Sequence, residues 1–232
     1  MSEELHGGHR ARMKARYLEQ GLDSLADHEA LELLLYYAIP RADVNPLAHR
    51  LIEHFGSFHA VLEAEVSELT QVSGVGESTA LLIRMVRELD RRYLIRKAES
   101  GGRPTLDKTD AAGTFFLPFF HGLREEQVYA AFLDDDFRLL KCRRMFEGGI
   151  NFAPLSVRKL VEAAIREHAT NLILAHTHPT GQAIPSVEDR DATQKLAAAL
   201  AGVQLQLADH IIVAGEEYLS MAECGYFERI SI

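Results

Sequence analysis

The sequence is poor in cysteine. It contains only Cys142 and Cys224, and neither belongs to a Cys-x-x-Cys pair. A disulfide scaffold and a cysteine-rich zinc site are therefore both disfavoured. Because so few thiols are typical of proteins from a reducing compartment, we expect a cytoplasmic protein.

Long hydrophobic runs are also missing. No apolar stretch approaches the roughly 18 residues that a membrane-spanning helix needs. The first residues, Met-Ser-Glu-Glu-Leu-His, have no apolar segment of the kind that a secretion signal contains. We therefore expect neither a signal peptide nor contact with a membrane.

Positive charge is in deficit, with 25 Lys and Arg against 34 Asp and Glu and a net charge of -9. The chain as a whole should not attract nucleic acid, so any such binding must come from a local patch. The remaining composition, 47% hydrophobic and 25% charged over 232 residues, is that of an ordinary globular protein with one large domain or two small ones.

Two histidines and an aspartate follow one short apolar run. His176 and His178 come directly after the run at residues 172–174, and Ser186 and Asp189 follow within eleven residues. A β-strand has a period of two, so both imidazoles point to the same side. Two imidazoles and one carboxylate, with a fourth position open to water, form the ligand set of a catalytic zinc site.

Each part of this pattern has a simpler explanation. Ser186 and Asp189, three residues apart, match an N-capping box at the start of a helix. A His-x-His pair also arises by chance in many chains. The ordered combination of both, joined by a proline-rich turn that can fold the aspartate back over the strand end, is much harder to explain by chance.

This stretch resembles a known family motif. The pattern His-x-His, seven residues, then Ser-x-x-Asp resembles the JAMM motif of JAB/MPN metalloproteases. The surrounding His-Thr-His-Pro-Thr-Gly and Pro-Ser-Val-Glu-Asp are similar to the RadC branch of that family. The commoner form of the motif has Asn and Ser where this chain has Thr177 and Thr180, neither of which is a metal ligand.

The resemblance implies a fold and a chemistry. It implies a mixed sheet flanked by helices, similar to cytidine deaminases, although the His-x-Glu and Pro-Cys-x-x-Cys signature of deaminases is absent. It also implies that His176, His178 and Asp189 hold one Zn²⁺, and that Ser186 donates a hydrogen bond to the oxyanion of a tetrahedral intermediate. The implied reaction is hydrolysis of a peptide or isopeptide bond.

Such a hydrolase needs a general base, and three glutamates are candidates. Glu126 directly precedes an apolar run at residues 128–133, and in the JAB/MPN family a glutamate at the start of the corresponding strand takes this role. Glu125 is the alternative, and the two would face opposite sides of a strand. Glu147 ranks below both, because RadC relatives do not usually have an acid there.

His210, which follows Asp209, is a further imidazole to place. As a fourth protein ligand it would overfill the site. We therefore expect it to have a structural role or to support a ligand.

The N-terminal part carries a different signal. Gly74, Val75 and Gly76 lie between two helical patterns and resemble a helix-hairpin-helix motif, a module that contacts DNA phosphates through its backbone. A structural or protein-binding hairpin is an equal alternative. The 13 basic and 16 acidic residues of positions 1–103 give a net charge of -3, which argues against strong DNA binding. Four basic residues near the N-terminus could form a phosphate-contacting arm: Arg10, Arg12, Lys14 and Arg16.

These patterns divide the chain into three parts. Residues 1–95 should form an all-α helix-hairpin-helix domain, with its last helix ending near Ile95, and the polar residues 96–104 a linker. Residues 105–232 should form an α/β domain. Its expected helices cover residues 109–122, 157–167 and 186–201, and its expected strands cover 128–133, 138–146, 172–175, 203–207 and 211–213, with Glu216 and Glu217 in the last turn.

Three functions fit the sequence. The first is a zinc-dependent metallopeptidase whose helical domain docks on DNA or on a partner protein. The second is a DNA-binding protein, associated with DNA repair as the RadC resemblance implies, whose metal domain acts on nucleic acid or serves only as a platform. The third is a non-catalytic platform, which the intact set of His176, His178, Ser186 and Asp189 disfavours.

Overall fold

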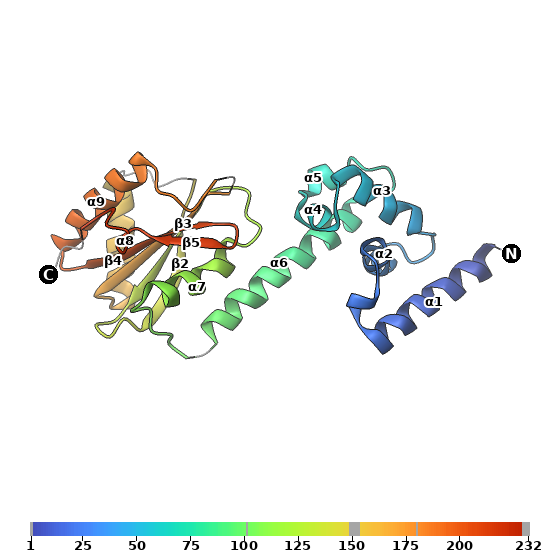
Figure 1. The fold of residues 1–232 in the computed structure, drawn as a ribbon, viewed down its shortest axis with the longest axis horizontal. Coiled ribbons are helices and arrows are strands. Elements are labelled where there is room, and N and C mark those ends of the chain that lie inside the picture. The colour runs from blue at the N-terminus through green and yellow to red at the C-terminus, as the bar shows by residue number, and fades with distance from the viewer. Residues whose placement is uncertain (1, 101, 149–153, 180, 229–232) are drawn as a thin grey trace. The chain divides into compact units, whose positions relative to one another are not determined.

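The protein is described by a computed structural model, which covers residues 2–100, 102–148, 154–179 and 181–228. The chain forms two compact units, Met1–Asp90 and Arg91–Ile232. Figure 1 shows helices in the first unit, and a sheet with flanking helices in the second. Each unit has its own hydrophobic core, because the clusters of buried side chains do not mix residues from the two.

The first unit is helical. Its elements are α1 (Ser2–Gln20), a short 3-10 helix (Leu22–Ser24), α2 (Asp27–Ala38), α3 (Asn45–Phe55), α4 (Phe58–Glu63), α5 (Val66–Leu69) and the first part of α6 (Glu77–Glu99). Gly56 ends α3 with φ of 88°, and the Ser57 hydroxyl caps α4 by accepting from the Ala60 N–H at 3.2 Å. These residues let the chain reverse direction sharply between two short helices.

Two of the four basic residues near the N-terminus, Arg10 and Arg16, are bonded within this unit. The Arg10 guanidinium donates to the Ile39 and Pro40 carbonyls at 2.8 and 2.7 Å, and it lies 4.4 Å from the centre of the Tyr36 ring. Arg16 pairs with Glu29. These two side chains hold α1 against α2 and the turn after it, so they are not free for phosphate.

Helix α6 continues beyond the expected end at Ile95. It runs to Glu99 and so includes the first four residues of the segment at 96–104 that was expected to be a linker. The composition of that segment is polar, but Arg96, Lys97, Ala98 and Glu99 are all compatible with a helix. The glycines that follow are the first residues to oppose the helical conformation.

The second unit is built on one five-stranded mixed sheet in the order β2-β1-β3-β4-β5. Its strands are β1 (Gln127–Leu133), β2 (Leu139–Glu147), β3 (Asn171–Thr177), β4 (Gln206–Ala214) and β5 (Glu217–Ser220). Strands β3 and β4 are parallel, and the other neighbouring pairs are antiparallel. The expected mixed sheet flanked by helices is confirmed.

Helices cover both faces of this sheet. Helix α7 (Thr109–Phe120) packs its phenylalanines on one face, against side chains such as Ile173 and Ile211. Helices α8 (Pro154–Glu167) and α9 (Val187–Ala201) pack on the other face, against Leu172, Leu174 and Ile212. Because β3 is buried on both sides, its sequence shows an unbroken apolar run rather than alternation.

The expectation for the last strands was wrong. Residues 203–207 and 211–213 were expected to form two strands, but a single strand, β4, runs from Gln206 to Ala214 and contains Asp209 and His210. This polar pair resembles a turn in the sequence, yet both residues are buried. The turn lies instead around Gly215, with φ of 59°, and Glu217 begins β5.

Among the described residues, no helix is both long enough and apolar enough to cross a membrane.

Candidate metal centre

The strand, turn and helix expected to form the metal site do bring its three residues together. His176 lies in β3, His178 follows the end of that strand, and Asp189 lies in the first turn of α9. The two imidazoles share one side of the chain because β3 is extended. Ligand atoms of His176, His178 and Asp189 all lie within 4.8 Å of one another.

The distances between these atoms fit a tetrahedral metal site. His176 Nε2 lies 2.9 Å from His178 Nε2 and 3.3 Å from Asp189 Oδ1, and His178 Nε2 lies 3.4 Å from Asp189 Oδ2. Tetrahedral ligands placed about 2.0–2.1 Å from zinc are about 3.3–3.4 Å apart. Each imidazole has this separation from one of the two Asp189 oxygens, His176 from Oδ1 and His178 from Oδ2, while the two imidazole nitrogens are closer by a few tenths of an ångström.

His178 is held in the orientation that a metal ligand requires. Its Nδ1 lies 3.2 Å from the carbonyl oxygen of Gln182, in the turn that leads to α9. A carbonyl oxygen only accepts hydrogen bonds, so the ring hydrogen of a neutral His178 lies on Nδ1. The lone pair of Nε2 then points at His176 and Asp189.

Ser186 supports the carboxylate of Asp189. The Ser186 backbone N–H and hydroxyl both donate to Asp189 Oδ2, at 2.8 and 2.6 Å, while the Asp189 backbone N–H donates to Ser186 Oγ at 3.0 Å. Ser186 is therefore the N-cap of α9 and a neighbour of the candidate ligand at once. Both explanations of this residue pair, the capping box and the metal site, are compatible in one geometry.

The pKa of Asp189 is displaced by opposing causes. Burial raises the pKa of this carboxyl, but the neighbouring His176 ring and the hydrogen bonds from Ser186 outweigh burial and hold the pKa well below its usual range. Asp189 is therefore an anion at neutral pH, as a metal ligand must be.

Strand register separates the three glutamates proposed as base. Val128 of β1 pairs with His176 of β3 in antiparallel register. This is the last pair of that ladder, and Glu126 lies two residues before Val128 and directly outside β1. Residues two apart in an extended chain point to the same side. Glu125 then faces the other way. Glu147 pairs with Gln127, whose side chain points away from the face of Val128, and forms an ion pair with Arg144 at 2.7 Å.

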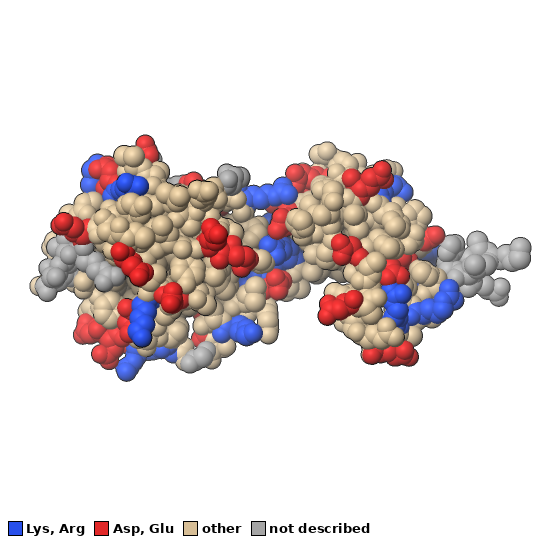
Figure 2. Space-filling model, viewed as in Figure 1, with Lys and Arg blue, Asp and Glu red and all other residues tan. Residues whose placement is uncertain are grey.

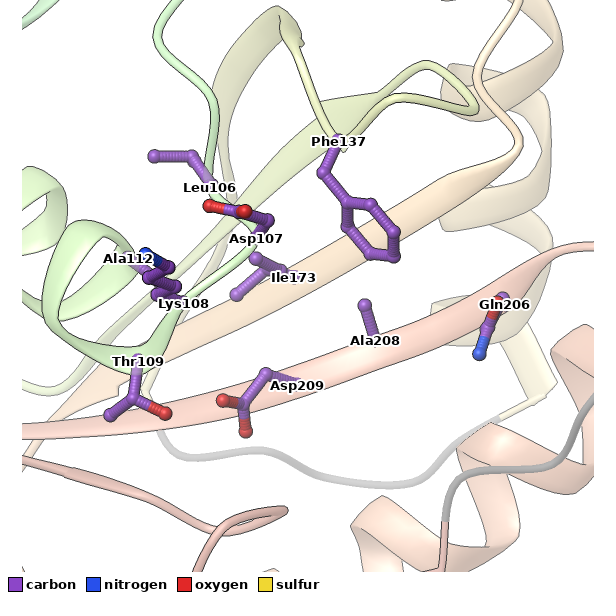
Figure 3. A pocket seen from close by; sticks show the side chains of 10 residues that line it. All are labelled: Leu106, Asp107, Lys108, Thr109, Ala112, Phe137, Ile173, Gln206, Ala208 and Asp209. Carbon is purple, nitrogen blue, oxygen red and sulfur yellow. The ribbon is translucent and has the colours of Figure 1, made fainter.

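His210 reaches the same face through an irregularity in β4. The register with β3 slips between Leu172 and Ile173, which pair with Leu207 and Asp209 and leave Ala208 as the extra residue. Figure 3 shows Ala208 and Asp209, consecutive in the chain, both lining a cavity of about 60 Å³ beside α7. A β-bulge shifts the alternation by one residue. His210 therefore faces α9, with its Nε2 2.8 Å from His176 Nδ1.

Comparison with known proteins agrees with this geometry. Residues 106–226 match the family described as RadC-like JAB domain, and residues 8–81 match UPF0758 N-terminal. UPF0758 protein GWCH70_2550 of Geobacillus sp. (strain WCH70) is 32% identical over 216 residues, which are 93% of this chain and 95% of the relative. The UPF0758 protein SPO0054 of Ruegeria pomeroyi is 33% identical and is matched over 96% of its length.

The chain belongs to the RadC-like JAB family. The family expected from the motifs is thus confirmed, and the JAB domain occupies the unit that contains the His-His-Asp group. The names of these UPF0758 relatives state no activity. Thr177 lies in β3 and its hydroxyl donates to the Val213 carbonyl at 3.0 Å, whereas Thr180 lies outside the described residues.

The sequence analysis did not identify two groups that lie near the candidate metal centre. One is the Gln182 carbonyl, which no residue type could reveal because it belongs to the backbone. The other is Thr193, whose hydroxyl donates to the Asp189 carbonyl at 2.5 Å and lies 2.7 Å from His210 Nδ1. A signal for Thr193 exists, since residues four apart share a helix face and Thr193 follows Asp189 by four.

The candidate hairpin of the helical unit has the expected local form. Gly74 has φ of 98°, a left-handed conformation that favours glycine, and Arg50 donates to the neighbouring Ser73 carbonyl at 2.7 Å. Val75 is buried, and open space surrounds the position of a Cβ at Gly76. Helix α6 starts directly after these residues, so its first N–H groups lie beside the hairpin.

Proposed function

We propose that this protein is a zinc-dependent hydrolase of the JAMM type that cleaves peptide or isopeptide bonds. The proposal rests on the proximity of His176 Nε2, His178 Nε2 and the Asp189 carboxylate, whose separations are 2.9, 3.3 and 3.4 Å. Lone pairs that face each other this closely repel one another unless a cation lies between them. The residues present therefore fit a divalent metal.

A zinc ion held there would polarise a substrate carbonyl and lower the pKa of a water molecule in its open position to about 7. Glu126 would orient that water and accept its proton, and its place two residues before Val128, the strand partner of His176, supports this role. Glu126 directly precedes β1 and is partly exposed, so solvent reaches it.

Ser186 would act on the reaction through its hydroxyl. In the proposed role the hydroxyl donates to the oxyanion that forms when the carbonyl carbon becomes tetrahedral. In the structure the same hydrogen is directed to Asp189 Oδ2. The proposed role thus requires the hydroxyl to rotate while Ser186 Oγ continues to accept from the Asp189 N–H.

The test is cleavage of peptide and isopeptide libraries by the zinc-loaded protein, by Glu126→Gln and by Glu125→Gln. Removing a general base reduces the rate by about 10²–10⁴-fold. We expect this loss in Glu126→Gln at unchanged zinc content, and little change in Glu125→Gln. Equal activity of Glu126→Gln and the parent would refute the assignment of the base. Absence of cleavage by the zinc-loaded parent would refute the proposed peptidase activity.

We also propose that the helical unit docks the enzyme on DNA or on a partner protein. The hairpin at Gly74 and Gly76 supports this, since it leaves backbone N–H groups beside open space. Charge limits the strength of a DNA contact: Arg84 pairs with Glu65 at 3.2 Å and Arg87 with Glu63 at 3.3 Å. Figure 2 shows acidic and basic side chains interspersed on the visible face of this unit.

Gly76→Ala tests the docking surface without disturbing the fold, because its φ is not left-handed and a Cβ meets no atom within 4 Å. If the hairpin backbone approaches a phosphate closely, the variant should bind a DNA duplex more weakly than the parent, and parent binding should fall steeply with salt. If neither protein binds a duplex at low salt, the docking partner is not DNA.

A further inference from the structure

Beside the candidate metal centre lies a chain of buried polar groups that the proposed reaction does not use. From His176 it passes through His210 to Thr193 and ends at the backbone carbonyl of Asp189. His176, His210 and Thr193 are each at most 1% exposed. Because water does not reach these groups, each of them must satisfy its hydrogen bonds within the chain.

The direction of each hydrogen bond follows from the last group in the chain. The Asp189 carbonyl oxygen can only accept, and Thr193 Oγ1 lies 2.5 Å from it, so the single hydroxyl hydrogen of Thr193 is directed there. The Met221 sulfur, 3.7 Å from Thr193 Oγ1, is a weaker acceptor. A hydrogen directed at this sulfur would also point away from His210. Thr193 can then only accept from His210.

The tautomer of His210 in turn determines where the hydrogen of His176 lies. Since Thr193 accepts at 2.7 Å, the hydrogen of His210 lies on Nδ1, and a neutral ring then has a bare Nε2. The bare Nε2 lies 2.8 Å from His176 Nδ1 and accepts the hydrogen of that nitrogen.

We propose that Thr193 and His210 are positioning residues that fix His176 in the tautomer with hydrogen on Nδ1 and a bare Nε2 directed at Asp189. The inference rests on the proposed metal site, because that tautomer is the one able to ligate through Nε2. The Gln182 carbonyl does the same for His178 directly. One ligand is thus oriented by the turn and the other by a chain that passes through α9 and β4.

The bulge in β4 is part of this arrangement. Without the extra residue, alternation from Leu207 would direct His210 to the face of α7, away from His176. Asp209 holds the bulge by accepting from the Ser220 hydroxyl and the His210 N–H, both at 2.6 Å, and from the Ala222 N–H at 3.2 Å.

The test reads the tautomers directly in metal-free protein, by two-bond ¹⁵N–¹H NMR spectra of the histidine rings. We expect His176 and His210 both to carry a hydrogen on Nδ1, and His210 to have a bare Nε2. A His176 with a bare Nδ1 or a His210 protonated on Nε2 would overturn the proposal. Because neither metal nor substrate is present, this result does not depend on whether the protein is a hydrolase.

Two matched variants separate positioning from packing. Thr193→Val keeps the shape of the side chain and removes the hydroxyl, whereas Thr193→Ser keeps the hydroxyl. We expect Thr193→Val to bind zinc about 10–100-fold more weakly, with mixed tautomers at His176, and Thr193→Ser to restore both properties. A Thr193→Val protein with the parent tautomer and parent zinc affinity would overturn the inference.

A second pair covers the case in which the Thr193 variants fold poorly. The amide oxygen of His210→Gln can still accept from His176 Nδ1, while His210→Leu cannot. We expect His210→Leu to lose about 10–100-fold in zinc affinity and His210→Gln to lose less. Equal affinities of the two variants would contradict a role through the hydrogen bond.

Discussion

Single side chains determine whether the three ligand atoms stay in place, and Ser186 contacts the candidate ligand Asp189 from two directions. Its backbone N–H and its hydroxyl both donate to Oδ2 of the carboxylate, and its oxygen accepts from the first turn of α9. Oδ1 receives neither of these bonds, and it faces His176 Nε2. Ser186 therefore couples the start of a helix to the orientation of a ligand.

Ser186→Ala should show both effects. The loss of the N-cap should reduce the free energy of unfolding by about 1 kcal/mol, as for other serine caps. The loss of the hydroxyl bond to Asp189 should reduce zinc affinity by about 10–100-fold. Chemical denaturation and zinc titration measure the two quantities, and Ser186→Thr, which keeps a hydroxyl, is the control. Unchanged zinc affinity in Ser186→Ala would show that Asp189 needs no support from this side chain.

Among the secondary structure elements, β4 carries the least regular geometry. Its bulge puts Asp209 in a buried position on the α7 side (Figure 3). Three hydrogen bonds converge on its carboxylate. Two of the donors are backbone N–H groups, and one of these belongs to His210. The geometry of the bulge and the direction of His210 therefore depend on the same side chain.

Asp209→Ala should destabilise the second unit more than Ser220→Ala does. The first change leaves the buried donors without their acceptor and should cost about 2–3 kcal/mol or more, whereas the second removes one donor and should cost about 1 kcal/mol. Urea denaturation compares the two variants with the parent. If Asp209→Ala is no less stable than Ser220→Ala, the carboxylate does not hold the bulge.

These elements also mark where sequence reasoning succeeds. The strand β3 and the cap of α9 could be predicted because an apolar run and a capping box are local signals. The proximity of Asp189 to His176 could be predicted as well, because a single proline-rich turn joins β3 to α9. The bulge could not be predicted, since a slip of register depends on the neighbouring strand, and Asp209 with His210 therefore resembled a break in the strand.

At the scale of the whole molecule, the two units have separate hydrophobic cores. The relatives match over more than nine tenths of the chain, so both units belong to the family together. The candidate metal ligands lie in the second unit, and the hairpin glycines lie in the first. A ligand of one unit should therefore stabilise that unit and leave the intrinsic stability of the other unchanged.

Zinc should raise the unfolding temperature of the second unit and leave that of the first unchanged. At free zinc near 100 times its dissociation constant, the second unit should gain about 2.7 kcal/mol, while the first should gain nothing. Differential scanning calorimetry with and without chelator should then show one transition that moves and one that does not. A single transition, or equal shifts of both, would contradict the independence of the two units.

The presence of a metal site is the central claim, and metal content tests it most directly. Protein purified without a polyhistidine tag should contain about one zinc per chain, and His178→Ala and Asp189→Ala should contain little. Asp191→Ala is the control, because it removes an exposed aspartate two residues further along the same helix. Absence of bound zinc in the parent, with no uptake when zinc is added, would contradict the account. So would a full zinc content in Asp189→Ala.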